Sequence, residues 1–161
     1  MSDSLRNKVV VITGASSGIG RSIALESASR GATVVLLARR LDKLEEIAAE
    51  ARELSASAAF AVKADLGLAS DIEAAFAEVK EKVKHIDYLV NAAGFGKFEE
   101  FMEADMQDAT EMFQVDVLGL MYMTRLFGRL MLEQGSGQII NFGSMAGKVP
   151  TLERGRGAGF Q

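Results

Sequence analysis

The feature that most constrains this chain is a repeated change from short apolar runs to helical patterns, first seen across residues 8–31. Residues 8–14, KVVVITG, form a β-branched run that ends in glycine, as expected of a strand buried on both faces. Residues 19–30 then carry a helical pattern, and Gly31 is placed to end it. A strand followed by a helix is therefore the expected unit.

This unit repeats through the rest of the chain. Ser70 and Glu73 have the spacing of a capping box and predict the start of one helix. Strands separated by helices favour parallel pairing, and hence an α/β fold with a doubly wound parallel sheet that places its ligand beyond the C-terminal ends of its strands. Further strands are predicted within residues 32–38, 58–65, 85–94 and 137–144, with helices between them, the last running from about 104 to 133.

Composition narrows the class of protein. A chain of 161 residues with 48% hydrophobic and 25% charged residues suits one domain with its own core. A net charge of -4 gives no basic stripe for nucleic acid, and no apolar run approaches the roughly 20 residues that cross a bilayer, so neither partner is expected. The lack of cysteine and the single histidine, His85, argue against a metal site and favour the reducing cytoplasm.

Glycine-rich and polar residues follow the predicted strands at the edge where a ligand would lie. Residues 13–20, TGASSGIG, hold three glycines between a strand and a helix N-terminus, where backbone N–H groups can approach a phosphate. A tight turn that needs positive φ is the other interpretation of this motif. The next three strands end in residues 38–40 (ARR), 64–65 (AD) and 91–94 (NAAG), and these small, polar or cationic groups suit a dinucleotide.

In these motifs the chain resembles the short-chain dehydrogenases and reductases, a family built on a single extended Rossmann domain. The resemblance covers residues 8–150 and includes TGASSGIG for the family's TGxxxGxG, NAAG for NNAG, and NFGSMAG for NxSSxAG. It implies a Rossmann-like doubly wound parallel sheet that binds a nicotinamide dinucleotide. The residues implied to hold the pyrophosphate, the adenine and the riboses are Thr13, Gly14, Ser16, Ser17, Gly18, Ile19, Gly20, Asp65, Leu66, Asn91, Ala92, Ala93 and Gly94.

Charge at the end of the second strand predicts which nicotinamide cofactor is bound. An acidic residue there would accept hydrogen bonds from the ribose 2′-OH, but this chain has Ala38 followed by Arg39 and Arg40. A contact between arginine and phosphate contributes about 1.5–3 kcal/mol, which favours NADP(H), with Arg39 as the expected phosphate contact. The alternative is that both arginines only solvate the helix start, where cations are unfavourable without a nearby anion.

The resemblance also implies the reaction, a hydride transfer between the nicotinamide and a small carbonyl or alcohol. In the family a Tyr acts as acid and base, a Lys lowers its pKa, a Ser orients the substrate and an Asn supports a water. Ser144 matches the serine, whereas Asp116 stands at the asparagine position and, when ionised, cannot donate a hydrogen bond. The Tyr and Lys positions fall on Gly157 and Gln161, which cannot perform those roles.

These departures predict an incomplete enzyme. Residues 1–150 are expected to form a dinucleotide-binding Rossmann domain that lacks the usual last strands, with residues 151–161 a disordered or aberrant tail. The expected activity is that of a weak or inactive NADP(H)-dependent oxidoreductase, and the alternative is a non-catalytic dinucleotide-binding fragment or pseudoenzyme. A 3-oxoacyl thioester is a second possible substrate class. The helix at 104–133 is the expected surface for any homo-oligomer.

Overall fold

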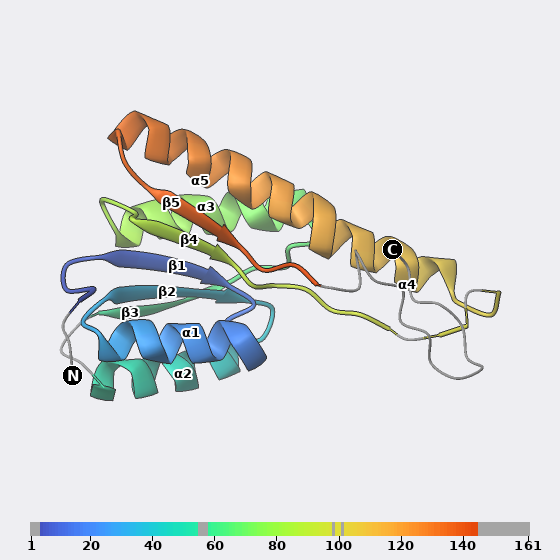
Figure 1. Ribbon diagram of the computed structural model, residues 1–161, viewed down its shortest axis with the longest axis horizontal. Coiled ribbons are helices and arrows are strands. Elements are labelled where there is room, and N and C mark those ends of the chain that lie inside the picture. Colours follow the sequence, from blue (N-terminus) through green and yellow to red (C-terminus); the bar gives the residue numbers. More distant parts are fainter. Residues whose placement is uncertain (1–3, 55–57, 98, 101, 145–161) are drawn as a thin grey trace.

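The computed structural model describes residues 4–54, 58–97, 99–100 and 102–144, which form a parallel sheet with helices on both faces (Figure 1). The strands are β1 (Val9–Thr13), β2 (Thr33–Ala38), β3 (Ala59–Lys63), β4 (Tyr88–Asn91) and β5 (Gln138–Asn141). The helices are α1 (Gly18–Ser29), α2 (Leu41–Leu54), α3 (Ala69–Lys82), α4 (Met106–Phe113) and α5 (Leu120–Gln134), with a π-helical segment, η1 (Gln114–Gly119), between the last two.

The strand order is β3-β2-β1-β4-β5, and every neighbouring pair is parallel. Val11, in the middle of β1, pairs with Val35 on one side and Leu89 on the other. The predicted α/β fold with a doubly wound parallel sheet is therefore confirmed. In this order the chain moves outward from β1 in both directions, so the switch point lies between β1 and β4, where such folds bind ligands.

Both faces of the central strands are buried, which explains why their sequences are apolar without alternation. Val10 and Leu36 pack on one face beneath α1 and α2, whereas Val11 and Val35 pack on the other face beneath α3 and α5. Phe127 of α5 meets Phe76 of α3 edge to face, with ring centroids 5.0 Å apart. These two layers hold β1 rigidly beneath the loops that follow the strands.

The start of α3 differs from the predicted capping box. The helix begins at Ala69 with Leu68 in the N-cap position, so Ser70 lies inside the first turn and cannot cap the helix. Two carboxylates order the preceding loop instead. Asp71 Oδ2 accepts a hydrogen bond from Asp65 N at 3.3 Å, and Asp65 Oδ1 accepts one from Gly67 N at 2.9 Å.

The predicted long helix is present at residues 106–134, but it is interrupted by η1. Gly119, at the end of η1, is buried, and a Cβ there would overlap the carbonyl oxygen of Leu66. A glycine inside a helix costs about 1 kcal/mol relative to alanine. Here it allows the helix to approach the loop after β3, which fixes where η1 and α5 lie on the sheet.

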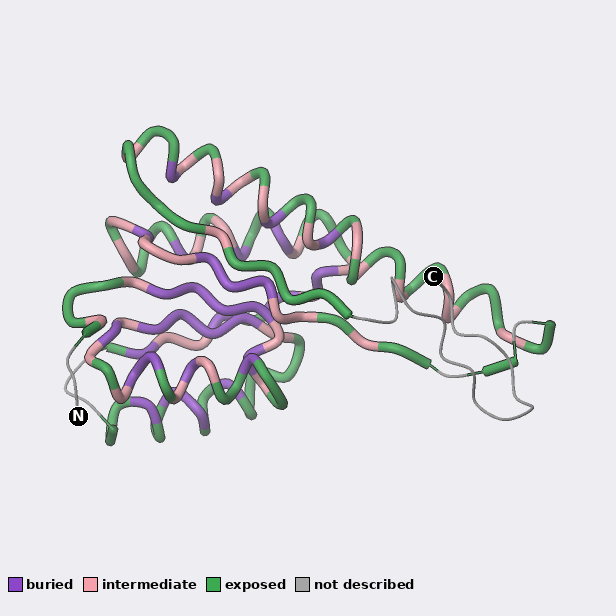
Figure 2. Tube along the Cα trace, viewed as in Figure 1, coloured by how far each residue is buried: buried purple, intermediate pink, exposed green. Residues whose placement is uncertain are grey.

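The strand β5 is the least covered part of the sheet. Among the described strands it has a neighbour on one side only, and Ile140 and Phe142 are 39% and 43% exposed. Figure 2 shows the contrast between the buried β1 and β2 and the largely exposed β5 and α4. Within the described residues β5 is therefore an edge strand with exposed apolar side chains.

Candidate functional site

The turn after β1 requires glycine at two positions for packing reasons. Gly14 has a φ of 66°, and a Cβ there would lie 2.7 Å from the Cα of Ala93. A Cβ at Gly20 would lie 2.5 Å from the carbonyl oxygen of Gly14. These distances are shorter than side chains tolerate, so Gly14 allows the turn to lie directly against the loop after β4, and Gly20 allows α1 to begin directly against the turn itself.

The third glycine, Gly18, faces open space. Its φ is 54°, and a Cβ there would meet no other atom within 4 Å. Ser17, the N-cap residue of α1, is extended and makes no side-chain cap bond among the described residues, while the neighbouring Ile19 is 58% exposed. The first N–H groups of a helix lack partners within the helix. An open, uncapped helix N-terminus of this shape fits a phosphate.

Thr13 joins this turn to the predicted NAAG motif. Its side chain is buried, and its Oγ1 accepts hydrogen bonds from the backbone N–H groups of Ala92 and Ala93, both at 3.1 Å. Together with the contact between Gly14 and Ala93, these bonds fix the ends of β1 and β4 against each other. The structure therefore brings the first and fourth predicted loops together at the switch point of the sheet.

Asn91 faces the protein interior. It is 2% exposed, and its Nδ2 donates to Thr124 Oγ1 at 3.2 Å and to Asn141 Oδ1 at 2.9 Å. Its own Oδ1 has no hydrogen-bond partner among the described residues. Because its amide links β4 to both α5 and β5, the geometry favours a role for Asn91 in holding the central strand.

The two arginines after β2 are both exposed, and they differ in their contacts. Arg40 Nη2 donates to Ser16 Oγ at 3.1 Å, so this guanidinium reaches the glycine turn. Arg39, the expected phosphate contact, makes no hydrogen bond to the described residues. The sequence analysis missed the pairing of Arg40 with Ser16, although both residues belong to loops predicted at the same edge of the sheet.

Asp65 and Leu66 follow β3 and have different surroundings. The Asp65 carboxylate is half-buried and accepts from Gly67 N, whereas the Leu66 side chain is buried in the core beneath α3 and α5. Leu66 therefore contributes packing, and its backbone is the part of it that borders the loop. Both residues lie one strand beyond Arg39 and Arg40, on the same half of the sheet.

Asp116 lies on η1 and reaches the loop after β4. Its Oδ1 accepts a hydrogen bond from Phe95 N at 3.2 Å and lies beside Gly94, where a Cβ would be 3.3 Å away. Partial burial raises the pKa of this carboxyl, and the hydrogen bond from Phe95 opposes the change. An acceptor at this position is sufficient to hold the turn at residues 94–95, so the aspartate meets that local requirement.

The predicted catalytic serine, Ser144, is the last described residue and is exposed in the loop after β5. Lys148, Gly157 and Gln161 lie outside the described residues. Tyr88 begins β4, at the strand edge opposite the glycine turn, and Tyr122 is an exposed residue of α5.

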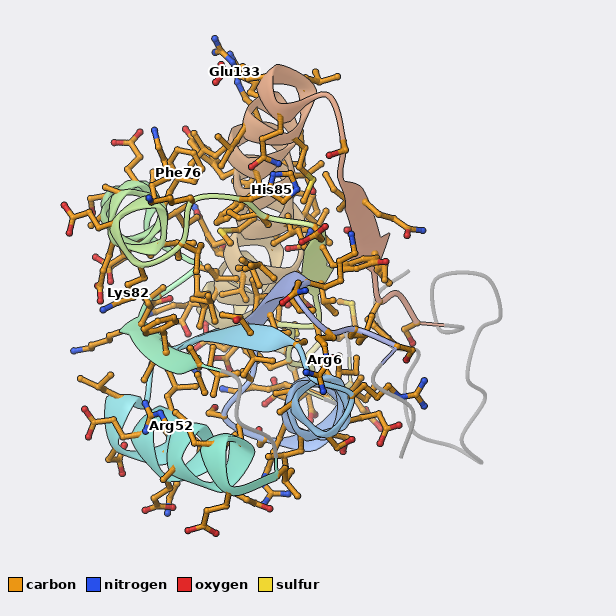
Figure 3. All side chains as sticks on the ribbon, turned by 90° about the vertical axis from the view of Figure 1, so that its left-hand side faces the viewer. Arg6, Arg52, Phe76, Lys82, His85 and Glu133 are labelled. Carbon is orange, nitrogen blue, oxygen red and sulfur yellow. The ribbon has the colours of Figure 1, made fainter. Side chains whose placement is uncertain are left out.

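The N-terminal ends of the strands, opposite the glycine turn, carry a different set of groups. Figure 3 views the N-terminal ends of the strands, where His85 lies, and its Nε2 is 3.6 Å from Asp87 Oδ1. Within the described ranges no three His, Cys, Asp or Glu side chains gather as metal ligands would. Those ranges also contain no helix of sufficient length and apolar character to cross a membrane.

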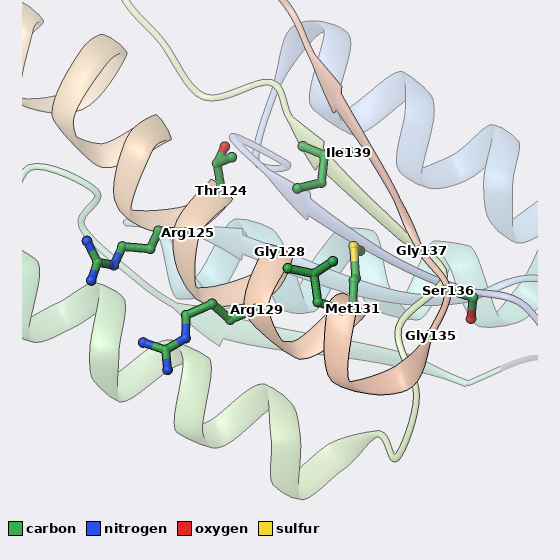
Figure 4. A pocket seen from close by; sticks show the side chains of 10 residues that line it. Thr124, Arg125, Gly128, Arg129, Met131, Gly135, Ser136, Gly137 and Ile139 are labelled. Carbon is green, nitrogen blue, oxygen red and sulfur yellow. The ribbon is translucent and has the colours of Figure 1, made fainter.

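A hollow of about 660 Å³ lies away from the glycine turn, along α5 beside β5. Figure 4 shows that Arg125 and Arg129 point to the same side of the helix, away from Ile139. Most of the surface of this hollow is apolar, and no carboxylate or histidine lines it. It therefore offers a packing surface, and the candidate chemistry stays at the switch point. The hollow is lined mainly by Thr124, Gly128, Met131, Leu132, Gly137 and Ile139.

The chain is thus a doubly wound α/β protein in which a glycine turn and an uncapped helix N-terminus lie at the switch point of the sheet. The chain matches the family model for short chain dehydrogenase over residues 8–155. The chain therefore belongs to the short-chain dehydrogenase family.

Individual relatives agree with this assignment. The chain is similar to 11-beta-hydroxysteroid dehydrogenase A of Sesamum indicum, at 38% identity over 151 residues that cover 93% of this chain and 43% of the relative. The structure of L-sorbose reductase from Gluconobacter frateurii with NADPH and L-sorbose matches with a TM-score of 0.84 and 34% identity, over 91% of this chain and 56% of that one.

A third match is an NAD+-bound xylitol dehydrogenase, with a TM-score of 0.85 and 29% identity, over 90% of this chain and 56% of that one. The chain thus spans about half the length of the relatives it matches.

Proposed function

We propose that residues 1–150 form the cofactor-binding domain of an NADP(H)-dependent short-chain oxidoreductase, which transfers a hydride between nicotinamide and a small carbonyl or alcohol. The observation that carries this proposal is the assembly of the glycine turn, the loop at 91–94 and Arg40 at one edge of the sheet. These groups come from the ends of β1, β4 and β2, the positions that surround the switch point.

Different loops at the C-terminal ends of the strands would hold different parts of the cofactor. Ser17 and Gly18 would hold the pyrophosphate at the N-terminus of α1, where the helix dipole favours negative charge. Asp65 and Leu66 border the adenine, which leaves the loop at 91–94 for the nicotinamide half. When bound, the nicotinamide supplies the carbon that carries the hydride. The protein groups hold the dinucleotide across β1 and keep its two halves apart.

Arg39 and Arg40 support a preference for NADP(H). The fold alone does not choose, because the similar structures include one with NADPH and one with NAD+. In this chain β2 ends at Ala38, where no carboxylate can bind the ribose 2′-OH, and two guanidinium groups follow. The bond from Arg40 to Ser16 holds one guanidinium above the turn, and Arg39 is left available for a phosphate.

The cofactor preference is tested by changing charge at this position alone. Arg39→Asp and Arg40→Asp should each weaken NADPH binding roughly ten- to hundredfold, measured by nucleotide fluorescence, and should change NADH binding far less. Lys84→Asp makes the same charge change at an exposed residue on the opposite edge and serves as the control. An unchanged ratio of NADPH to NADH affinity in both arginine variants would contradict the assignment.

The catalytic part of the proposal concerns Ser144 and Asp116. Ser144 would orient a substrate oxygen, and Asp116 supports the loop after β4 by accepting a hydrogen bond from Phe95 N. Gly157 and Gln161 stand where the family has its Tyr and Lys, which supports weak or absent turnover by this chain. A non-catalytic, NADP(H)-binding role is the second candidate function, and this same substitution of residues favours it.

Turnover separates these two functions. NADPH oxidation is measured with a panel of aldehydes, ketones and a 3-oxoacyl thioester, alongside a binding titration. NADPH binding without turnover supports the non-catalytic role, whereas turnover that Ser144→Ala removes supports the enzyme. The relatives are named for a steroid and for sugars, so they do not select one substrate class.

We also place a second copy of the chain on the helices α4 and α5. The acidic α4, with Glu111, would face the basic Arg125 and Arg129 of the other copy, while Asp108 stays paired with Lys97. Light scattering of the chain should show a dimer that Met121→Glu dissociates. The exposed apolar residues of this surface, on α4, η1 and α5, are Met106, Phe113, Leu118, Met121, Tyr122 and Leu132.

The cysteine-free composition supports a cytoplasmic location.

A further inference from the structure

The adenosine half and the nicotinamide half of the proposed cofactor site are bordered by side chains of different charge. Arg39, Arg40 and Asp65 follow β2 and β3, so the adenosine half lies over that side of the sheet. A dinucleotide spans the switch point, and its nicotinamide half must therefore lie on the side of β4 and β5. This step rests on the proposed function, because it takes the bound dinucleotide as its starting point.

Asp116 is the charged residue that borders the nicotinamide half. Its carboxylate touches the loop directly after β4, through Phe95 N and beside Gly94. No described lysine, arginine or histidine forms an ion pair with it. Lys97, the nearest cation along that loop, is paired with Asp108 of α4. Among the described residues, the negative charge of Asp116 therefore has no cationic partner on this side of the site.

The oxidation state of nicotinamide determines its charge. The oxidised ring carries one positive charge and the reduced ring carries none, while the phosphates are the same in both forms. A nearby uncompensated carboxylate stabilises only the positive ring by direct Coulomb attraction. We infer that Asp116 shifts the cofactor preference of this site toward NADP+ over NADPH, compared with an amide at the same position.

The expected size of this effect is modest because Asp116 is partly exposed. Charges about 8 Å apart, at an effective dielectric constant between the values for a protein surface and for water, change a binding constant by about two- to sixfold. Salt reduces the effect, since the Debye length falls from about 10 Å at 0.1 M to about 3 Å at 1 M. The preference should therefore be measured at low ionic strength first.

The test compares the dissociation constants of NADP+ and NADPH in the whole chain and in Asp116→Asn. The asparagine keeps an oxygen that can accept from Phe95 N, so the loop contact is retained while the charge is removed. Calorimetric titration of both nucleotides should show NADP+ binding weakened about two- to sixfold in the variant, with NADPH binding weakened less or not at all. Glu111→Gln, which removes the same charge from α4, should leave the ratio unchanged.

Salt provides a measurement that needs no variant. The ratio of the two dissociation constants in the unaltered chain should move toward that of Asp116→Asn at 1 M salt, because the contribution of the 2′-phosphate cancels in the ratio. An equal ratio in the chain and in Asp116→Asn at low salt overturns the inference. Failure of the unaltered chain to bind either nucleotide overturns the proposed function itself, and the inference with it.

Discussion

The central strands β1 and β2 and the edge strand β5 are covered to very different extents. Val11 and Val35 are fully buried between two helical layers, whereas Ile140 and Phe142 beside β5 remain substantially exposed. The helix α4 contains no buried residue at all. The phosphate cradle that we propose is therefore built on the well-packed strands, whereas Ser144 and Asp116 are exposed.

The residues proposed to bind the cofactor and those proposed to act in the reaction therefore lie in differently packed parts of the structure. The cradle depends on buried strands and on two glycines that touch backbone, and these contacts are complete within the described residues. The groups on the nicotinamide side depend on a loop hydrogen bond and on an edge strand. We therefore expect substitutions at Thr13 and Gly14 to affect stability and binding together, and substitutions at Ser144 and Asp116 to leave stability nearly unchanged.

The largest contrast in stability should come from two phenylalanines, one in each environment. Phe127→Ala removes a fully buried ring that packs against Phe76, and should lower the free energy of unfolding by about 3–5 kcal/mol. Phe142→Ala removes a ring that is 43% exposed and should cost less than about 1 kcal/mol. Urea unfolding of both variants measures the contrast, and equal losses would mean that burial does not determine what each ring contributes.

A smaller effect is expected from two glycines within the cradle. Gly14→Ala introduces both a positive-φ alanine and an overlap with Ala93, and should cost about 3 kcal/mol. Gly18→Ala introduces the positive φ alone and should cost about 1 kcal/mol. Thermal or urea unfolding separates the two, and a Gly18→Ala variant at least as unstable as Gly14→Ala would show that the contact with Ala93 is unimportant.

The smallest expected effect is a pH dependence at the edge opposite the site. Burial alone would raise the pKa of Asp87, but hydrogen bonds from Lys8 Nζ and Val9 N, with the positive charge of Lys8, outweigh it and lower the pKa. A lowered native pKa gives stability that is present above the unfolded pKa of about 3.9 and is lost as pH falls through the native value.

Asp87→Asn should remove that contribution. The difference in unfolding free energy between the chain and this variant, measured between pH 7 and pH 3, should shrink as the pH falls. A difference that stays constant over this range would mean that the ion pair with Lys8 does not contribute. Asp87→Asn perturbs β1 and β4 at the end remote from the cradle, so the measurement reports on strand stability apart from the proposed site.

The sequence predicted the parts of the structure that local pattern controls. The apolar runs in β1 and β2 indicate buried strands, and the alternation of strands with helices indicates the doubly wound parallel sheet that the structure has. The capping box at Ser70 was wrong, because Asp65 and Asp71 order that loop through contacts that spacing does not reveal.

Features that depend on contacts between distant segments were not predictable in the same way. The π-helical segment at 114–119 lies where Gly119 meets Leu66, and only the folded chain brings these residues together. The same is true of the bond between Arg40 and Ser16. Gly119 was visible as an interruption in the helical pattern, but its partner was not.

The central claim is that the glycine turn and the arginines after β2 form an NADP(H) site in this chain. Calorimetric titration of the unaltered chain with NADPH and with NADH tests it most directly. The account predicts one NADPH per chain, bound at least about ten times more tightly than NADH, as a charge-assisted contact to the 2′-phosphate implies. Equal affinity for the two nucleotides, or no binding of either, would contradict it.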